Sequence, residues 1–146
     1  MVTAGGVVLA IDYGHRRVGL ATGHPLTGTA QPLKTITHSG DPYSAINRII
    51  DEWRPNTVVV GLPLTPAGDE SDMSRAVRAF VAELETQQPR IDFVFHDERY
   101  SSQQADAQFK RARQQGRARR SDAANLDSHA AAVILESWLA SQRLSQ

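Results

Sequence analysis

The sequence predicts an α/β protein built on a mixed five-stranded sheet with helices on both of its faces. Two observations predict this class. Short runs rich in β-branched residues alternate along the chain with longer segments in which apolar residues recur at helical spacing. In addition, the first three strands follow one another closely enough to form a meander, whereas the later strands are separated by helices and need crossover connections.

Five segments have the composition of strands. The run VVLAIDY at residues 7–13 is apolar and ends in an acid followed by a tyrosine, and TVVVG at 57–61 has the pattern of a buried strand. The run IDFVFH at 91–96 first alternates apolar and polar residues and then becomes apolar. Two shorter strands are expected at residues 18–22 and 33–37.

Four segments have helical periodicity, namely residues 43–53, 71–84, 101–114 and 125–142. Asp41 and Pro42 precede the first of them and provide a capping residue and a proline suited to the first turn. There is no internal repeat and no low-complexity tract between these segments. Residues 1–146 are therefore expected to form a single domain.

Composition favours a cytoplasmic protein and limits the function classes. The chain of 146 residues is 40% hydrophobic, and its longest apolar run, AAAVIL, is far shorter than the roughly 20 residues that a membrane helix needs. Its first residues lack the pattern of a signal peptide. The absence of cysteine excludes disulfides and thiolate metal ligands. Because 16 basic residues balance 16 acidic ones, attraction to nucleic acid must come from local clusters of charge.

Three acids are placed where they could form one site. Asp12 ends the first strand and Glu98 lies just beyond the strand at 91–96, and open α/β sheets bind ligands at these carboxyl ends. Asp127 begins a helical stripe whose later members are apolar and should pack on the sheet. Hard carboxylate ligands favour Mg²⁺ or Mn²⁺, which neutralise the repulsion among clustered acids. We therefore expect these acids to bind metal, with Asp12 shared between two ions, and to cut phosphodiesters.

Each acid taken alone has a simpler interpretation. An aspartate at the end of a strand usually caps a turn, and Asp127 could be favoured by the helix dipole alone. Asp97 and Glu98 could both be solvated loop charges, and the residue types alone do not decide which of them belongs to the site. The convergence of three acids favours the metal site, and it leaves open whether one ion or two are bound.

Basic residues close to these acids are candidates for nucleic-acid binding. Arg16 and Arg17 lie between Gly14 and Gly19, and these glycines permit a tight turn and the close approach of a phosphate. Strand alternation allows only one of the two arginines to face the site, and Arg17 is preferred. The alternative is that one arginine simply pairs with Asp12.

A second group of candidates follows the strand at 91–96. Arg99 could contact phosphate or pair within the protein. The segment at 110–120 carries six basic residues and no acid, which favours phosphate contact over an ordinary solvated helix face. Its basic residues are Lys110, Arg111, Arg113, Arg117, Arg119 and Arg120.

Four motifs resemble signatures of the YqgF/RuvX family, in the family's order and over nearly the whole chain. They are DYGHRRVGLA at 12–21, GLPL at 61–64, DERYSS at 97–102 and LDSHAAAVILESWL at 126–139. The resemblance implies an RNase H-like fold and a divalent-metal nuclease that matures the 5′ end of the pre-16S ribosomal RNA. Carried over by position, it implies Asp12, Glu98 and Asp127 as catalytic acids, so it selects Glu98 over Asp97.

Alternative functions remain open at this point. Nothing in the residues separates RNA from DNA, so a Holliday junction resolvase acting on branched DNA is the first alternative, and it would need a dimer to cut two strands symmetrically. An alternative of another class is a non-catalytic RNA-binding factor in ribosome assembly. ATP binding of the sugar-kinase type ranks low, because 146 residues cannot build a cleft between two domains. Cut position, mode of cleavage and oligomeric state are not set by the sequence, and no membrane partner is expected.

Overall fold

The computed structural model describes residues 6–98 and 126–144. The helix expected at 101–114 and the basic segment at 110–120 lie outside the described residues. In chain order, the elements are β1 (Val8–Tyr13), β2 (Arg17–His24), β3 (Thr29–Thr37), α1 (Tyr43–Trp53), β4 (Thr57–Leu62), α2 (Asp72–Gln87), β5 (Asp92–Asp97) and α4 (Leu126–Leu144).

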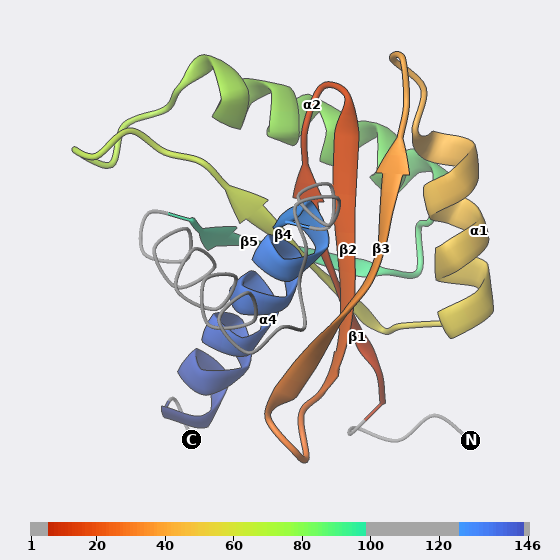
Figure 1. Ribbon diagram of the computed structural model, residues 1–146, viewed down its shortest axis with the longest axis vertical. Coiled ribbons are helices and arrows are strands. Elements are labelled where there is room, and N and C mark those ends of the chain that lie inside the picture. Colours follow the sequence, from red (N-terminus) through yellow and green to blue (C-terminus); the bar gives the residue numbers. More distant parts are fainter. Residues whose placement is uncertain (1–5, 99–125, 145–146) are drawn as a thin grey trace, which may run out of the picture.

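The strands form one mixed sheet in the order β3-β2-β1-β4-β5 (Figure 1). β1, β2 and β3 pair antiparallel, which confirms the meander. β4 pairs parallel with both β1 and β5, and the connections run through helices. Since β1, β4 and β5 are parallel, their carboxyl ends meet at one end of the sheet. This end is where Asp12 and Glu98 lie.

The β2–β3 hairpin is longer than its apolar pattern indicates. The strands were expected at 18–22 and 33–37, but they extend to His24 and back from Thr29. Most residues of β3 are exposed or half-buried, so neither strict alternation nor a continuous apolar run marks its first half.

The helix starts follow local hydrogen bonding. Ser71 caps α2 and forms a capping box with Ser74, in which Ser71 Oγ accepts from the Ser74 backbone N–H at 2.9 Å. At the start of α1 the expectation was wrong, because Pro42 itself is the N-cap. Asp41 still contributes, since its Oδ1 accepts a hydrogen bond from the backbone N–H of Tyr43 at 3.2 Å.

Helices cover both faces of the sheet, as expected (Figure 1). α1 and α2 pack on one face, against Leu9 and Ile11 of β1. α4 packs on the other face, against Val8 and Ala10. Strand alternation therefore assigns the odd-numbered residues of β1 to the α1/α2 face and the even-numbered ones to the α4 face. Asp12 belongs to the second set.

α4 carries the expected apolar stripe. Ala131 and Ile134 are buried and Trp138 is partly buried in the same cluster. This packing holds the first turn of α4, with Asp127, over the carboxyl end of the central strands. No helix in the described part of the chain is apolar over a length that would let it cross a membrane.

Candidate active site at the carboxyl end of the central strands

Asp12 is flanked by glycines on the sheet face that α4 covers. Gly19 is its direct partner in β2. On the other side, Gly61 of β4 follows Val60, which pairs with Ile11. Because neither glycine has a side chain, the strands leave space around the Asp12 carboxyl group that other groups can enter.

Glu98 occupies the space above Gly61. The backbone N–H of Glu98 donates to the carbonyl oxygen of Leu62 at 3.1 Å, which continues the β4–β5 pairing beyond the end of β5. A Cβ on Gly61 would lie 2.5 Å from Glu98 Oε1. Gly61 thus lets the Glu98 carboxyl group reach that of Asp12, with which it forms a hydrogen bond.

Strand alternation separates Glu98 from its neighbour Asp97. His96 lies on the α4 side, where its Nε2 is 2.9 Å from Ser137 Oγ. Phe95 lies on the other side, beneath a guanidinium group of α2. Continuing the alternation carries Glu98 to the α4 face with Asp12 and carries Asp97 to the α2 face. The choice between the two acids, which rested on the resemblance alone, thereby gains a geometric basis.

Asp127 reaches the same region from the first turn of α4. A Cβ on Gly19 would overlap the backbone carbonyl of Asp127, so the helix rests directly on β2 at this position. Gly19 was expected to admit a phosphate to the backbone, and the group that approaches it closely is instead the helix. The Asp127 charge is felt at Asp12, where its repulsion contributes to a raised pKa.

The Asp12 and Glu98 carboxyl groups behave as one pair. Burial raises the pKa of Asp12 well above its ordinary value, and repulsion by Glu98, a hydrogen bond that Asp12 donates to Glu98 and repulsion by Asp127 raise it further. Burial also raises the pKa of Glu98, which the hydrogen bond to Asp12 opposes. Two carboxyl groups in contact repel each other strongly when both are ionised, and a cation bound between them would relieve this repulsion.

Arg17 is a positive charge that the described residues bring to this site. Its Nε lies 2.9 Å from Asp127 Oδ2, and its side chain is 53% exposed. The same oxygen accepts no hydrogen bond, so the contact is a close ion pair whose N–H is not aimed at the oxygen. Both arginines are exposed, but Arg17 begins β2 on the face of Gly19, whereas Arg16 lies in the preceding turn. Of the two candidate arginines, Arg17 is the one that the fold brings to the acids.

The donor set suits a hard divalent cation, although it is not assembled around a single point. A cation would relieve the repulsion between Asp12 and Glu98, and Asp127 Oδ2 is a buried oxygen with no hydrogen-bond donor among the described residues. Within residues 6–98 and 126–144, however, no three acidic or histidine side chains are grouped closely enough to hold one ion together. Asp127 is instead engaged by Arg17.

His38 fixes the turn that carries Arg17, and the sequence patterns did not single it out. Its Nε2 is 2.9 Å from the Gly14 carbonyl, its backbone N–H donates to the Arg16 carbonyl at 2.8 Å, and its Nδ1 accepts from the Gly40 N–H. Since a carbonyl only accepts, the neutral ring must carry its proton on Nε2. His38 is 24 residues away from Gly14 and belongs to no motif, so no sequence signal links the two.

The other predicted binding residues, Arg99 and the basic residues of 110–120, lie outside the described residues.

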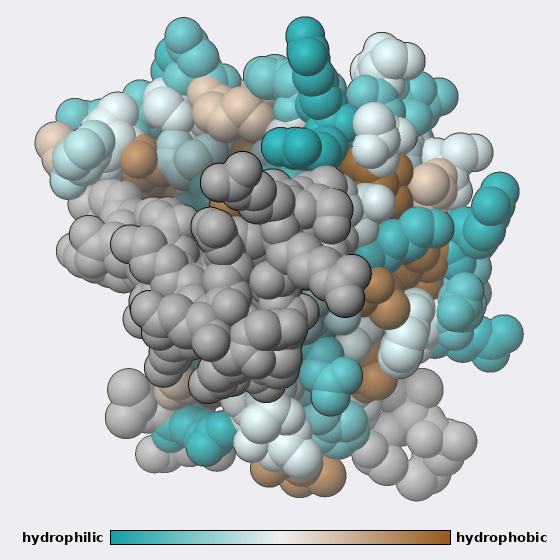
Figure 2. All heavy atoms as spheres, viewed as in Figure 1, coloured by the Kyte–Doolittle hydropathy of each residue, from teal (hydrophilic) through white to brown (hydrophobic). Residues whose placement is uncertain are grey.

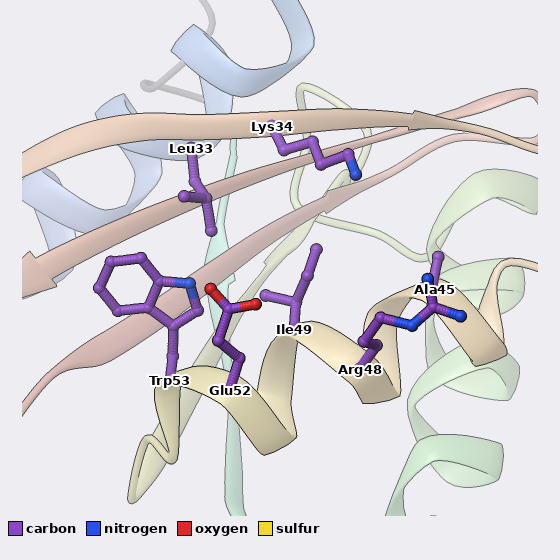
Figure 3. Close-up of a pocket in the computed structure, with 7 residues that line it drawn as sticks. All are labelled: Leu33, Lys34, Ala45, Arg48, Ile49, Glu52 and Trp53. Atoms are coloured by element: carbon purple, nitrogen blue, oxygen red, sulfur yellow. The ribbon is translucent and has the colours of Figure 1, made fainter.

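A pocket of about 250 Å³ is found on the opposite side of the sheet, between β3 and α1, where apolar side chains reach the surface (Figures 2 and 3). It belongs to the α1/α2 face, so it is not part of the acid cluster. Its lining residues are Leu33, Lys34, Ala45, Arg48, Ile49, Glu52 and Trp53.

Comparisons with known proteins identify the family. Residues 6–141 match the family model described as "RuvX: Holliday junction resolvase". The chain belongs to the RuvX family. Among the relatives of this RuvX chain is the "Putative pre-16S rRNA nuclease" of Xanthomonas oryzae pv. oryzae (strain PXO99A), which is 42% identical over 137 residues, covering 92% of this chain and 88% of the relative. The protein of the same name from Xylella fastidiosa (strain 9a5c) is 41% identical over the same shares.

Solved structures confirm the RNase H-like resolvase fold. Thermus thermophilus RuvC in complex with a Holliday junction substrate matches with a TM-score of 0.57 at 16% identity, over 94% of this chain and 96% of that one. The fowlpox virus resolvase bound to Holliday junction DNA matches with a TM-score of 0.60 at 10% identity, over 93% and 98%. At these identities the likeness concerns the RuvX fold and not the substrate.

Proposed function

We propose that this RuvX-family protein is a metal-dependent nuclease that hydrolyses phosphodiesters of structured RNA, with the 5′ end of pre-16S ribosomal RNA as its target. The observation that carries the proposal is the close approach of the Asp12 and Glu98 carboxyl groups on the face closed by α4. Such a pair is costly to bury and is expected where a cation is to be bound. The names of the relatives support pre-16S RNA as the substrate.

Each residue of the site has a distinct part in this proposal. Asp12 and Glu98 would hold Mg²⁺ or Mn²⁺ directly, and Asp127 would complete the set of acidic ligands. When bound, such an ion lowers the pKa of water and stabilises the leaving oxygen. Gly61 leaves room for the Glu98 carboxyl group, and Gly19 holds the backbone of Asp127 against β2. Among the described residues, Arg17 is a positive charge beside these acids that could hold a substrate phosphate.

Regions beyond this site would extend the contact with nucleic acid. Arg16, Arg99 and the basic residues of 110–120 remain candidates for contacts that position the backbone of the substrate without reading its sequence. A ribosomal precursor as substrate implies that the protein works in the cytoplasm.

A second function, resolution of Holliday junctions, is supported by a different observation. The family description names this activity, and solved structures of the same fold hold junction DNA. Both functions use the same acids, so only the preferred nucleic acid distinguishes them. We rank RNA first because relatives above 40% identity carry the ribosomal name, whereas the junction-bound structures are at most 16% identical.

The test compares cleavage of a pre-16S RNA fragment and of a four-way DNA junction, with Mg²⁺ or Mn²⁺ and with a chelator. Asp12→Asn, Glu98→Gln and Asp127→Asn are each expected to lower the cleavage rate roughly 100-fold or more. Substitution of a residue that only supports a metal ligand already lowers activity by up to about 100-fold, and these acids would be ligands themselves. Asp97→Asn is the matched control, because it removes a neighbouring charge from the opposite face. It is expected to keep its activity.

The outcomes separate the proposed functions. Cleavage that persists in the chelator, or in Asp12→Asn, would contradict the metal-dependent nuclease and favour a non-catalytic assembly factor. Faster cleavage of the junction than of the RNA would assign the enzyme to branched DNA.

A further inference from the structure

Arg17 holds the acid that the proposed metal site still needs. Asp12 and Glu98 are already in contact, whereas Asp127 Oδ2 lies 2.9 Å from the Arg17 Nε. Within the described residues this oxygen accepts no hydrogen bond, so its recorded contact with Arg17 is one of charge attraction. The Arg17 side chain is also half exposed, and exposed ion pairs are weak. The contact can therefore be exchanged for another without disturbing the core.

Only the side chains are free to make this exchange. The backbone of Asp127 is fixed by its contact with Gly19, and Gly19 is paired with Asp12 across the sheet. The helix cannot slide, because its apolar stripe is buried beneath it. A rotation of the Asp127 side chain away from Arg17 is thus the small movement that would change its partner.

We propose that Arg17 and a divalent ion compete for the Asp127 carboxylate, so that binding of the ion releases the arginine for a phosphate of the nucleic acid. This inference rests on the proposed metal-dependent function. A guanidinium group and a metal ion that lie against the same carboxylate repel each other, so each weakens the binding of the other.

The charges at the site permit this exchange. In the structure, Arg17 compensates the charge of Asp127. A divalent ion in its place would supply at least as much positive charge, and the guanidinium group would then be free beside the acids.

The experiment measures Mn²⁺ binding by the whole protein without nucleic acid, by calorimetry and by the loss of the free-ion electron paramagnetic resonance signal. Arg17→Met keeps the length of the side chain and removes its charge. We expect it to bind Mn²⁺ roughly two- to fivefold more tightly, as befits loss of a half-exposed competing ion pair. Arg75→Met is the matched control, because it removes an arginine from the exposed ion pair with Asp72, away from the acids. It should leave the Mn²⁺ affinity unchanged.

A double substitution tests whether Asp127 is the shared partner. In an Asp127→Asn background, Arg17→Met should no longer tighten Mn²⁺ binding, since the competition has been removed. In cleavage assays, Arg17→Met should reach half its maximal rate at lower Mn²⁺ concentration but should need more RNA, which is a rise in KM.

Failure of this inference and of the proposed function can be told apart. If the unchanged protein binds Mn²⁺ and Arg17→Met binds it equally or more weakly, the competition is contradicted and the nuclease proposal stands. If the unchanged protein binds no Mn²⁺, both are overturned.

Discussion

The two faces of the sheet are built from the same strands but from residues of different size. On the α1/α2 face, large side chains such as Leu9, Ile11 and Phe80 are fully or almost fully buried in the larger apolar cluster. On the α4 face, the strands contribute mainly small residues, including Ala10 and Ala21. The first face fills space and stabilises the fold, whereas the second lets a helix approach the strands and leaves space for acids at their carboxyl ends.

The comparison explains why the acids gather on one side only. Near Asp12 the α4 face is reduced to glycine, at Gly19 and Gly61, and these two positions meet Asp127 and Glu98. A strand residue of ordinary size at either position would occupy the volume that these acids need. Small residues thus decide where the candidate site is, and alternation along the strands decides which acids belong to it.

The largest effect on stability is expected from the α1/α2 face. Phe80 is 2% exposed, and its ring is stacked on Tyr13 with the centroids 4.3 Å apart. Phe80→Ala should lower the free energy of unfolding by about 3–5 kcal/mol, because it leaves a cavity in the core. Denaturant unfolding measures this loss. The cleavage rate per folded molecule at low temperature should change little. A fall in this rate as large as the fall in stability would show that the α1/α2 face also contributes to catalysis.

A smaller effect is expected from Gly61→Ala on the α4 face, and here the cleavage rate should fall more than the stability does. The new Cβ would meet Glu98 Oε1 at 2.5 Å and Ile134 Cδ1 at 2.7 Å. The flexible end of Ile134 can shift, but the Glu98 carboxyl group would be pushed away from Asp12. We expect the cleavage rate to fall by roughly 10- to 100-fold while most of the stability remains.

The double variant Gly61→Ala/Glu98→Asp sharpens this test. A shorter acid leaves room for the Cβ, so the two substitutions should cost less together than the sum of their separate effects. Full activity in Gly61→Ala alone would show that the glycine does not control the position of Glu98.

The smallest effect is a gain of stability at the candidate site. Burial and the neighbouring acids raise the pKa of Asp12 in the folded state, so the folded protein binds its proton more tightly than the unfolded chain does. The stability that this group contributes is present below the ordinary pKa of about 4 and is lost as the pH rises through the raised value. Asp12→Asn should therefore raise the melting temperature near pH 7 by roughly 2–4 °C and should add nothing near pH 3.

Thermal unfolding at the two pH values, followed by circular dichroism, checks this sign. A lower melting temperature for Asp12→Asn at pH 7 would mean that the Asp12 carboxylate stabilises the fold. The repulsion among the acids on the α4 face would then not destabilise the protein as expected.

The sequence predicts the elements of this fold well and their contacts only in part. Periodicity located the helix at 43–53 correctly and the apolar stripe from Ala131 to Trp138 that seats α4. It missed the outer half of the β2–β3 hairpin, because most of those residues face solvent and show no regular apolar pattern. Apolar periodicity reveals a strand or helix only where one of its faces is buried, so a solvent-exposed segment such as this one gives no signal.

At the candidate site, too, local features were predictable from the sequence and long-range contacts were not. The acids could be proposed from strand ends and motifs, but Asp97 and Glu98 could not be separated by geometry before the pairing of β4 with β5 was known. Likewise, the partner of Arg17 is 110 positions further along the chain, at Asp127, and His38 reaches its turn from another strand's end. These are long-range contacts, which one local window of sequence does not contain.

The three acids come from an early strand, from the end of the last strand and from the final helix, and this spacing has a consequence for biosynthesis. The antiparallel β1–β2–β3 meander can form while the chain is still being made, because its contacts are local. Glu98 joins Asp12 only after two parallel pairings, and Asp127 joins them only when α4 docks on the finished sheet. A nascent chain that does not yet contain α4 would lack Asp127, so under the proposed function the three acids would come together only after α4 has been made and has docked.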